Sequence, residues 1–468
     1  MRFYLFPFLF IVRLTCTSVI SINQQDPAFD TRILASRLSD PWSIAVGPDR
    51  NLWITESKGY RVMVVDPKNG KKFQVLNLNS ERDFPSFQEM KKTGRPVPQG
   101  GLMGLALHPD FMKGKPFVYL SYVYKHISGN HFLLKLARYK YSFSLKQLKS
   151  PEIICDSIPA SNDHNGGRMI ISPIKGKPYL FYSVGDQGAG QFSNGGRKNK
   201  AQQLTSYEGK ILRFALEPNS RRSWIPTDNP IVAYPSAVWS WGHRNSQGLA
   251  FALVGGKERL YSSEHGPYSD DEINMISKGK NYGHPLVIGY PDGNYDGLAA
   301  SVSNESKYPG KWHTTYPFIR SEKANADSIG RNYTEPLVSL YPTPGAELSK
   351  LFNSIKTGKD SGWNSYAPSG ISVYQSDAIP GWNASLLVTS LKQGKLLRLK
   401  INPDGTINPK VHEFASSLSR YRDVTVSPDG RKIYLITDSS AITSGPTAEN
   451  PKSINQRGCI IELTYQSK

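Results

Sequence analysis

The sequence predicts an all-β protein, a six-bladed β-propeller of four-stranded antiparallel blades with long loops at the end that carries the site. Two observations lead to this fold class. The 468 residues include 25 Tyr, 19 Phe and 8 Trp beside 40 Gly and 33 Pro, a mixture of strand formers and turn formers that suits short strands joined by tight connections. In addition, one short pattern recurs six times along the chain.

The recurring pattern is an apolar pair, a turn centred on Pro or Gly, and a strand rich in Tyr, Leu and Val. Each copy is typical of a strand, a tight turn and a second strand. A lone hairpin cannot bury its apolar face, whereas neighbouring four-stranded blades pack around an axis, so the repeats predict a radial array. The six copies occupy residues 45–56, 105–122, 170–186, 249–266, 371–391 and 425–440.

The uneven spacing of the copies predicts long insertions at one end of the blades. Segment 285–365 is the largest insertion, and its Gly, Asn, Ser, Lys and Tyr content with weak periodicity predicts loops with short helices. Such loops commonly carry the functional site on a rigid scaffold. No linker divides the chain, so residues 22–468 are expected to form a single domain.

Residues 1–21 have the pattern of a secretory signal peptide. A basic residue is followed by an apolar run from Phe3 to Val12 and then by small residues, which puts the expected cleavage at about residues 18–21. The run is too short to span a bilayer, and no later stretch is apolar enough. We therefore expect a protein without a transmembrane segment that is periplasmic or secreted.

The formal net charge of the whole chain is +19, and removing Arg2 and Arg13 with the signal peptide lowers it by two. Lys and Arg are scattered, with no long basic block and no arginine-rich helix, so a nucleic-acid partner is not expected. Cys155 and Cys459 remain after processing. They either pair in an oxidising compartment or stay as two thiols, and the sequence leaves both open.

Polar clusters follow several of the predicted strands, among them "SNDHNGG" (161–167), "GHRNSQG" (242–248) and "SRYRD" (419–423). In a radial array, equivalent strand ends converge on one end of the central axis. We therefore expect a single cavity surrounded by Asp163, His164, Arg244, Asn245, Lys392, Arg420 and Arg422.

Four of these side chains are cationic. Placing them around one cavity costs electrostatic free energy unless an anion binds there. "RYR" places Arg420 and Arg422 on the same face of a strand, and guanidinium pairs bind carboxylates bidentately. Simpler interpretations exist for each residue: a solvated strand edge for the arginines and an ordinary surface lysine for Lys392. Together the four cations indicate a guest with several carboxylates or phosphates.

The stretch "SNDHNGGRM" (161–169) has two interpretations. Asx residues and paired glycines are ordinary turn formers, so His164 alone is more typical of a turn than of a catalytic base. The stretch "EHGPYSDDE" (264–272) brings carbonyl and carboxylate oxygens together, which suits Ca²⁺. Its alternative is an acidic turn, because the spacing is not that of an EF-hand.

Motifs for other cofactors are missing from the sequence. It contains no G-x-G-x-x-G after a strand, no P-loop, no H-E-x-x-H and no G-x-S-x-G. The glycine-rich loop 188–196 opens no predicted helix. Nicotinamide and ATP chemistry therefore lack support.

Eight collinear motifs resemble the soluble glucose dehydrogenases that use pyrroloquinoline quinone (PQQ), together with the wider aldose and sorbosone dehydrogenase group. The resemblance runs from about residue 30 to the C-terminus and thins between 290 and 365. The motifs are "GGLMGLALHPDF", "DHNGGR", "SVGDQG", "GKILR", "GHRNSQGLAF", "SEHGPYSDDEINMISKGKNYGHP", "SLKQGKLLRLK" and "RYRDVTVSPDG".

The resemblance implies an exported quinoprotein oxidoreductase that carries one PQQ and Ca²⁺ and oxidises a glucose-like aldose at C1 to the lactone, with hydride passing to PQQ. His164 would be the general base, Asp163 the carboxylate that orients it, and Arg244 a group beside the reactive carbonyl. Trp363 and Ser365 would form a wall of the site. The residues expected to hold or flank PQQ are Gln99, Arg244, Asn245, Lys392, Arg420, Arg422, Trp363 and Ser365.

The backbone carbonyls of Gly266 and Pro267 match the ligands of the cofactor's Ca²⁺ in that family. A second, structural Ca²⁺ site is implied at Glu272 and Asp292 with the carbonyls of Tyr282, Ile288 and Tyr290. One further acidic ligand is expected near 320–330, close to Asn325 or Asp327.

The sequence also departs from the family pattern near the expected substrate. His265 stands where the glucose enzyme has an amide, His284 replaces an aromatic after "NYG", and the loop before Trp363 is shortened. The preferred sugar is therefore open. The expected partners are the aldose and an external electron acceptor, and a homodimer remains open.

Two other functions fit the same fold. One is a non-catalytic propeller that binds glycans or proteins, although a binder has no reason to concentrate cations around a channel. The other is a Ca²⁺-dependent propeller lactonase, which would use the metal and His164 but would not need Lys392, Arg420 and Arg422 together.

Overall fold

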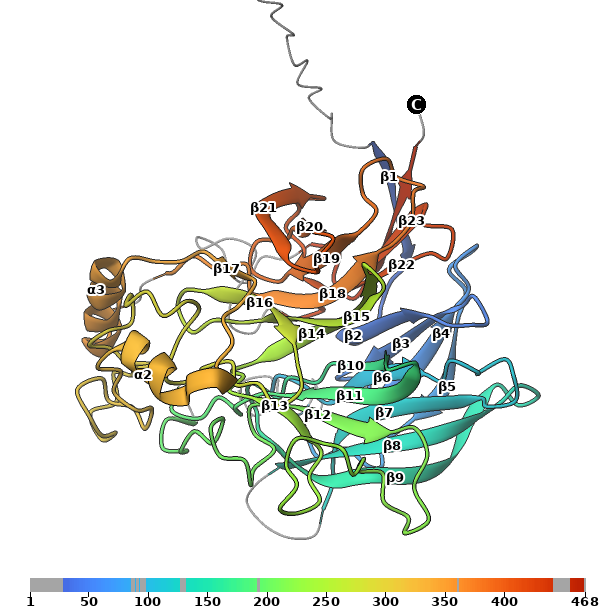
Figure 1. The fold of residues 1–468 in the computed structure, drawn as a ribbon. Coiled ribbons are helices and arrows are strands. Elements are labelled where there is room, and N and C mark those ends of the chain that lie inside the picture. The colour runs from blue at the N-terminus through green and yellow to red at the C-terminus, as the bar shows by residue number, and fades with distance from the viewer. Residues whose placement is uncertain are drawn as a thin grey trace, which may run out of the picture.

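The computed structural model describes residues 28–85, 89, 92, 98–126, 132–191, 194–359, 362–440 and 455–466. Within them, 24 strands form six four-stranded sheets whose pairs are all antiparallel (Figure 1). The predicted six-bladed propeller is confirmed. The predicted signal peptide, residues 1–21, lies outside the described residues.

The first three blades follow one another in the chain. Blade 1 consists of β2 (Pro41–Val46), β3 (Leu52–Glu56), β4 (Arg61–Val65) and β5 (Lys72–Asn77). Blade 2 consists of β6 (Leu102–Leu107), β7 (Phe117–Tyr124), β8 (Phe132–Ser142) and β9 (Gln147–Ala160). Blade 3 consists of β10 (Met169–Ile174), β11 (Lys177–Val184), β12 (Lys210–Ala215) and β13 (Val238–Trp241).

The remaining blades complete the ring. Blade 4 consists of β14 (Ser246–Val254), β15 (Lys257–Glu264), β16 (Asp271–Ile276) and β17 (Val338–Leu340). Blade 5 consists of β18 (Pro368–Tyr374), β19 (Ser385–Ser390), β20 (Leu396–Ile401) and β21 (Ile407–Phe414). Blade 6 consists of β22 (Tyr421–Val426), β23 (Lys432–Thr437), β24 (Ile460–Tyr465) and β1 (Phe29–Ala35).

Pairing between the two ends of the described chain closes the ring. The N-terminal strand β1 is the outer strand of blade 6 and pairs with β24, with Asp30 opposite Thr464. In Figure 1 the blue β1 accordingly lies among the red C-terminal strands. This pairing ties the N-terminal and C-terminal segments into one blade and so joins the two ends of the ring.

All six recurring sequence patterns form the two inner strands of a blade, for example β2 and β3 for residues 45–56. The first strands of neighbouring blades pack against one another around the axis. The apolar core is divided into clusters between adjacent blades, such as the one that joins Ile54 of blade 1 to Ile436 of blade 6. Each hairpin therefore buries its apolar faces only when its neighbours are present.

The large insertion 285–365 contains the short helices that its composition predicts. They are α2 (Glu322–Ile329), the 3₁₀ turn η2 (Gly330–Asn332) and α3 (Gly345–Lys356), and Figure 1 shows α2 and α3 together at one side of the blades. The insertion also supplies β17, the outer strand of blade 4, which the sequence pattern did not reveal. At three residues, β17 is too short for a periodic signal.

The state of the two cysteines, which the sequence left open, is given by the fold. Cys155 in β9 and Cys459 before β24 are free thiols, so the disulfide alternative is not formed. Among the described residues, no helix is long and apolar enough to cross a membrane.

A buried ion pair at the axis joins four blades. Arg168, immediately before β10, bonds the carboxylate of Asp423 in β22 and donates from Nη1 to Ser43 Oγ at 3.1 Å. Its Nε donates to the carbonyl of Gln247 in β14 at 2.7 Å, and the N–H of Ile44 donates to Asp423 at 3.0 Å. The inner strands β2, β10, β14 and β22 are thereby held at one level around the axis.

Replacing Arg168 with Met should destabilise the fold, because Asp423 would be left as a buried charge without its partner. The expected loss is about 3–5 kcal/mol in the free energy of unfolding, measured by denaturant titration. The double variant Arg168→Met with Asp423→Leu should recover much of the loss, since no charge is then left unpaired. Equal instability of the single and double variants would contradict this account.

Candidate active site

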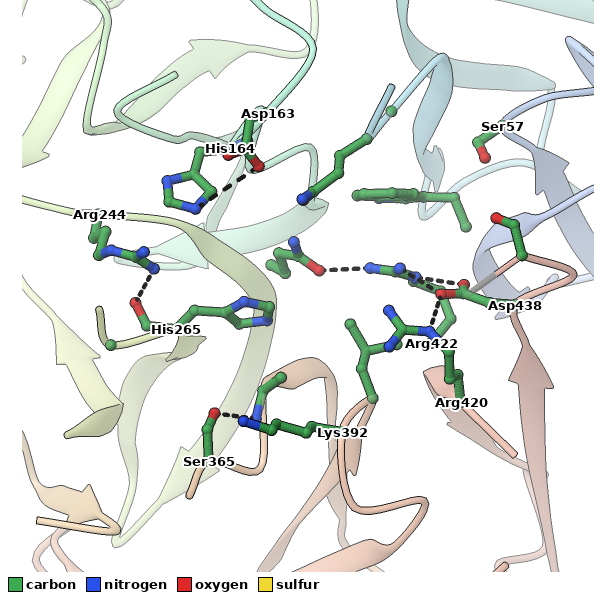
Figure 2. A pocket seen from close by; sticks show the side chains of 18 of the residues that line it. Ser57, Asp163, His164, Arg244, His265, Ser365, Lys392, Arg420, Arg422 and Asp438 are labelled. Atoms are coloured by element: carbon green, nitrogen blue, oxygen red, sulfur yellow. Dashed lines mark hydrogen bonds and ion pairs between the residues drawn. The ribbon is translucent and has the colours of Figure 1, made fainter. Parts of the chain in front are cut away.

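A cavity of about 1060 Å³, counted with its open mouth, lies at one end of the propeller axis (Figure 2). Because the strands of a blade are antiparallel, the loop that enters its first strand and the loop that leaves its second strand lie at the same end. Those loops line the cavity. The predicted site residues among the lining are Gln99, Asp163, His164, Arg244, Gly266, Pro267, Trp363, Ser365, Lys392, Arg420 and Arg422.

Asn245 is the predicted cofactor residue that does not line this cavity. It is buried behind the wall, where its Oδ1 accepts a hydrogen bond of 3.2 Å from the N–H of Gly166. Its own N–H donates to Glu264 Oε1 at 3.2 Å. Asn245 thus fastens the loop of His164 to the loop of Arg244.

The loop that carries His164 is both a tight turn and part of the cavity wall. His164 has a φ of 46°, in the left-handed region that few residues other than Gly adopt. Gly166 has a φ of 65°, and a Cβ there would lie 2.7 Å from the carbonyl oxygen of Ser183. The paired glycines therefore allow the turn to press against β11 while the imidazole faces the cavity.

The imidazole of His164 has a different carboxylate partner from the one predicted. Its Nδ1 lies 2.7 Å from Oδ1 of Asp186, whereas its Nε2 lies 3.8 Å from Oδ1 of Asp163. The orienting contact therefore belongs to Asp186, of the motif "SVGDQG", and not to Asp163. Asp163 instead accepts the N–H of His164 at 3.0 Å and faces the cavity at the edge of the ring.

Asp186 is fully buried and accepts hydrogen bonds on both oxygens. Burial on its own raises the pKa of this carboxyl, but the imidazoles of His164 and His284 hold the pKa well below its ordinary value. Asp186 is therefore a carboxylate at neutral pH. A carboxylate at Nδ1 selects the imidazole tautomer with its proton on Nδ1, which leaves Nε2 unprotonated and able to act as an acceptor.

Gln191 connects the imidazole to the guanidinium of Arg244. Its Nε2 lies 2.9 Å from both Asp163 Oδ2 and His164 Nε2, and its Oε1 accepts from Arg244 Nη2 at 3.0 Å. Arg244 also donates to the carbonyl of His265 at 3.2 Å. The sequence does not mark Gln191 as a site residue, because it follows "SVGDQG" in a loop without a regular pattern.

His265 stands in the same wall as an uncharged ring. Burial, reinforced by the positive charge of Arg244, holds its pKa well below the ordinary value. Its backbone N–H donates to Asn245 at 3.4 Å. A neutral imidazole at this place can donate to or accept from a ligand.

Arg420 and Arg422 lie on one face, as the spacing predicted, and they share the carboxylate of Asp438. Arg422 makes a bidentate pair at 2.8 and 2.7 Å, and Arg420 Nε donates at 3.2 Å; Figure 2 shows both guanidiniums turned toward Asp438. Arg422 also lies over the ring of Trp42, 4.3 Å from its centroid. One carboxylate thus balances part of the charge of two arginines.

Two lysines extend the positive wall. Lys392 donates to the carbonyl of Trp363 and lies 4.3 Å above the indole, and burial lowers its pKa to about 8. Lys58, which is not among the residues predicted from the sequence, donates to the carbonyls on either side of Gln99, and burial lowers its pKa to about 8 as well.

The cavity has an excess of positive charge and of unused donors. Five cationic side chains line it, namely Lys58, Arg244, Lys392, Arg420 and Arg422, against the three carboxylates Asp40, Asp163 and Asp438. Among the described residues, four buried atoms of the cavity lining lack a hydrogen-bond partner, namely Trp42 Nε1, Arg244 Nε, His265 Nε2 and Arg420 Nη1, and so does Asn245 Nδ2 behind the wall. Because buried polar atoms are normally paired, this wall suits an anionic guest rich in acceptors.

The predicted calcium ligands Gly266 and Pro267 lie in the cavity wall. Their carbonyl oxygens accept no hydrogen bond from a described residue. The loop is fixed by Asp271, whose carboxylate accepts from the N–H of Gly266 at 3.0 Å and from Ser365 Oγ at 2.7 Å. The two carbonyls are therefore available to a cation that prefers oxygen ligands.

The residues of the second predicted site surround the loop 288–293. Glu272 accepts the N–H of Gly289 at 3.0 Å, and the carbonyls of Tyr282, Ile288 and Tyr290 accept no hydrogen bond from a described residue. Asp292 belongs to the same loop. No group of three acidic, His or Cys side chains arranged for a metal is found within the described residues, so this site would depend on backbone carbonyls.

Within the expected stretch 320–330, the buried acidic residue is Glu322. Glu322 accepts from the N–H of Ile288 at 2.8 Å, whereas Asp327 is exposed and pairs with Lys323. Burial raises the pKa of Glu322 to about 8. The sequence did not identify Glu322, because the weak periodicity of the insertion does not define where α2 begins.

Comparison with known proteins agrees with this geometry. Residues 38–326 and 325–443 match the family described as Glucose / Sorbosone dehydrogenase. The chain belongs to that family. The predicted resemblance is thus confirmed, and it extends over most of the length of the protein.

Two curated relatives cover nearly the whole chain. Quinoprotein glucose dehydrogenase B of Acinetobacter calcoaceticus is 33% identical over 94% of this chain and 92% of its own length. Aldose sugar dehydrogenase YliI of Escherichia coli is 26% identical over 92% of this chain and 96% of its own length. The PQQ-bound aldose sugar dehydrogenase of Streptomyces coelicolor has the same fold, with a TM-score of 0.61 at 23% identity over 94% of this chain and 100% of that one.

Proposed function

We propose that this chain is an exported quinoprotein that uses PQQ and Ca²⁺ to oxidise a glucose-like aldose at C1 to the lactone, with His164 as the general base. An external acceptor then reoxidises the cofactor. The observation that carries the proposal is one cavity in which cationic side chains with unused donors face an imidazole backed by a buried carboxylate. Family membership and the quinoprotein relative agree with it.

The wall fits PQQ because the cofactor is a flat tricarboxylate quinone. Lys392, Arg420 and Arg422 would bind its carboxylates, with Gln99, Asn245, Trp363 and Ser365 around it. Arg244 would stand beside the reactive carbonyl, where its charge favours negative charge on oxygen. When bound, PQQ supplies the hydride acceptor, and the protein contributes orientation and polarisation.

His164 is suited to remove the proton of the C1 hydroxyl. Its Nδ1 is held by Asp186, so the lone pair of Nε2 is directed to the cavity side that Gln191 and Asp163 border. When Nε2 takes the proton, the carboxylates of Asp186 and Asp163 stabilise the imidazolium. Asp163 thus keeps a place in the proposed chemistry, as a second anion beside the base.

Calcium would bind at two places in this proposal. The carbonyls of Gly266 and Pro267 would hold the ion next to the cofactor. Glu272 and Asp292, with the carbonyls of Tyr282, Ile288 and Tyr290, would hold a structural ion. Glu322 accepts the N–H groups of Ile288 and Gly293 at the two ends of the same loop.

Purified apoprotein should be inactive with nicotinamide and flavin cofactors and should oxidise aldoses once PQQ and Ca²⁺ are added. The unpaired donors of the wall suit an anionic guest, and the carbonyls of Gly266 and Pro267 suit a cation. The measurement is dye reduction across a panel of aldoses, with a chelator added before reconstitution as the control. Tight PQQ binding without oxidation of any aldose would exclude the enzyme and leave a binding protein.

His164→Ala should keep its PQQ affinity and its melting temperature but lose kcat by about 10²–10⁴-fold, the usual effect of removing a general base. The native pH profile should show one group that must be deprotonated, and that limb should weaken in the variant. The measurement is kcat per reconstituted site. If His164 were only a turn residue, the variant would melt earlier and its remaining folded sites would turn over normally.

PQQ affinity should fall as pH rises through about 8, where Lys392 loses its charge. Below that pH the ammonium is positive and attracts a carboxylate; above it the attraction is lost, with a slope of at most about tenfold per pH unit. Lys392→Arg, which stays charged, should flatten the dependence in a fluorescence titration of PQQ, leaving only the part due to Lys58. An unchanged slope would remove Lys392 from the cofactor site.

A further inference from the structure

A second histidine lies across the buried carboxylate from the proposed base. Asp186 Oδ1 is 2.7 Å from Nδ1 of His164, and its Oδ2 is 2.9 Å from Nε2 of His284. The two imidazoles are therefore joined through one carboxylate. His284 stands where the family resemblance led us to expect an aromatic residue that could not make this contact through a ring nitrogen.

The ring of His284 is rigidly held. Its backbone N–H donates to the carbonyl of Gly242 at 3.0 Å, and its carbonyl accepts from Gln202 Nε2 at 2.7 Å. The ring packs edge-on against Tyr316, with 5.6 Å between ring centroids. Its Nδ1 is buried without a partner among the described residues, so the ring hydrogen belongs on Nε2, where it is donated to Asp186.

The two oxygens of Asp186 carry different donors. Oδ1 accepts from His164 and from the N–H of Gly188 at 3.0 Å. Oδ2 accepts from His284, from the hydroxyl of Tyr316 at 2.6 Å and from Asn199 Nδ2 at 3.0 Å. Each donor on Oδ2 draws negative charge away from the oxygen that faces His164.

We propose that His284 is a positioning residue for the base: by donating to Asp186 it fixes the rotation of that carboxylate and limits the negative charge presented to Nδ1 of His164. The proposal rests on the proposed function of His164. The consequence is that His164 releases a proton more readily with His284 present than with an aromatic residue at that position.

Other charged groups also act on His164 and must stay constant in any test. Asp163 lies 3.8 Å from its Nε2, and Arg244 is connected to it through Gln191. His265 interacts with it electrostatically, and Tyr316 lies on Asp186. None of these groups is changed by substitution of His284, so a shift in the titration of His164 would report the donor that was removed.

Three substitutions separate the donor from the shape of the ring. His284→Gln places an amide N–H where Nε2 stood and should retain the contact with Asp186. His284→Asn is too short to reach it, and His284→Phe keeps the ring but has no donor. Tyr316→Phe removes a different donor from the same oxygen and calibrates the size of the effect.

The first readout is the titration of His164 in apoprotein with labelled histidine, followed by NMR and assigned with His164→Gln. The midpoint should rise on the order of half a pH unit, or about threefold in proton affinity, in His284→Asn and His284→Phe. It should stay near the native value in His284→Gln. In reconstituted protein, the acid limb of kcat should move to higher pH by the same amount, while KM for the sugar changes little.

The outcomes distinguish this assignment from the proposed function. The role of His284 would be overturned if His284→Asn and His284→Phe fold but His164 titrates with its native midpoint. It would also be overturned if these variants melt at a lower temperature while the pH profile of kcat stays unchanged. A shifted midpoint in apoprotein that oxidises no aldose with PQQ would support the coupling and count against the enzyme. Aldose oxidation with an unmoved midpoint would leave the enzyme standing and remove His284 from its mechanism.

Discussion

The ion pair between Arg168 and Asp423 at the axis is the constraint on which the site depends. It holds the inner strands of four blades at one level. Those strands begin after the loops that carry His164, Arg244 and Arg420, so the pair sets the separation of groups that are far apart in the chain. If one blade shifted relative to its neighbours, one wall of the cavity would move relative to the others.

Contacts within the protein hold several cations close together in the cavity. Arg420 and Arg422 share Asp438, Lys58 is held by backbone carbonyls, and Lys392 lies on an indole. These contacts hold the side chains in place but leave buried donors unused. Affinity for an anionic cofactor would then come from groups that are already ordered, which keeps the entropic cost of binding small.

Patterns with a short period were recoverable from the sequence, and contacts between loops were not. The six hairpins, the shared face of Arg420 and Arg422 and the place of His164 followed from local spacing. The partner of His164 did not, because Asp186 is 22 residues away in the loop that follows β11. Glu322 was missed for a related reason: a long insertion without periodicity gives no register by which to count.

By itself, the sequence determined the propeller, its number of blades, the residues that converge at one end of the axis and the family. Those features depend on hairpin periodicity and on motifs read in order. Only the tertiary structure decided which carboxylate holds the base, that Lys58 joins the positive wall, and that His284 reaches Asp186 from the far side. The physical reason is that hydrogen bonds depend on positions to within a few tenths of an ångström, and those positions are set by the packing of blades rather than by any one stretch of chain.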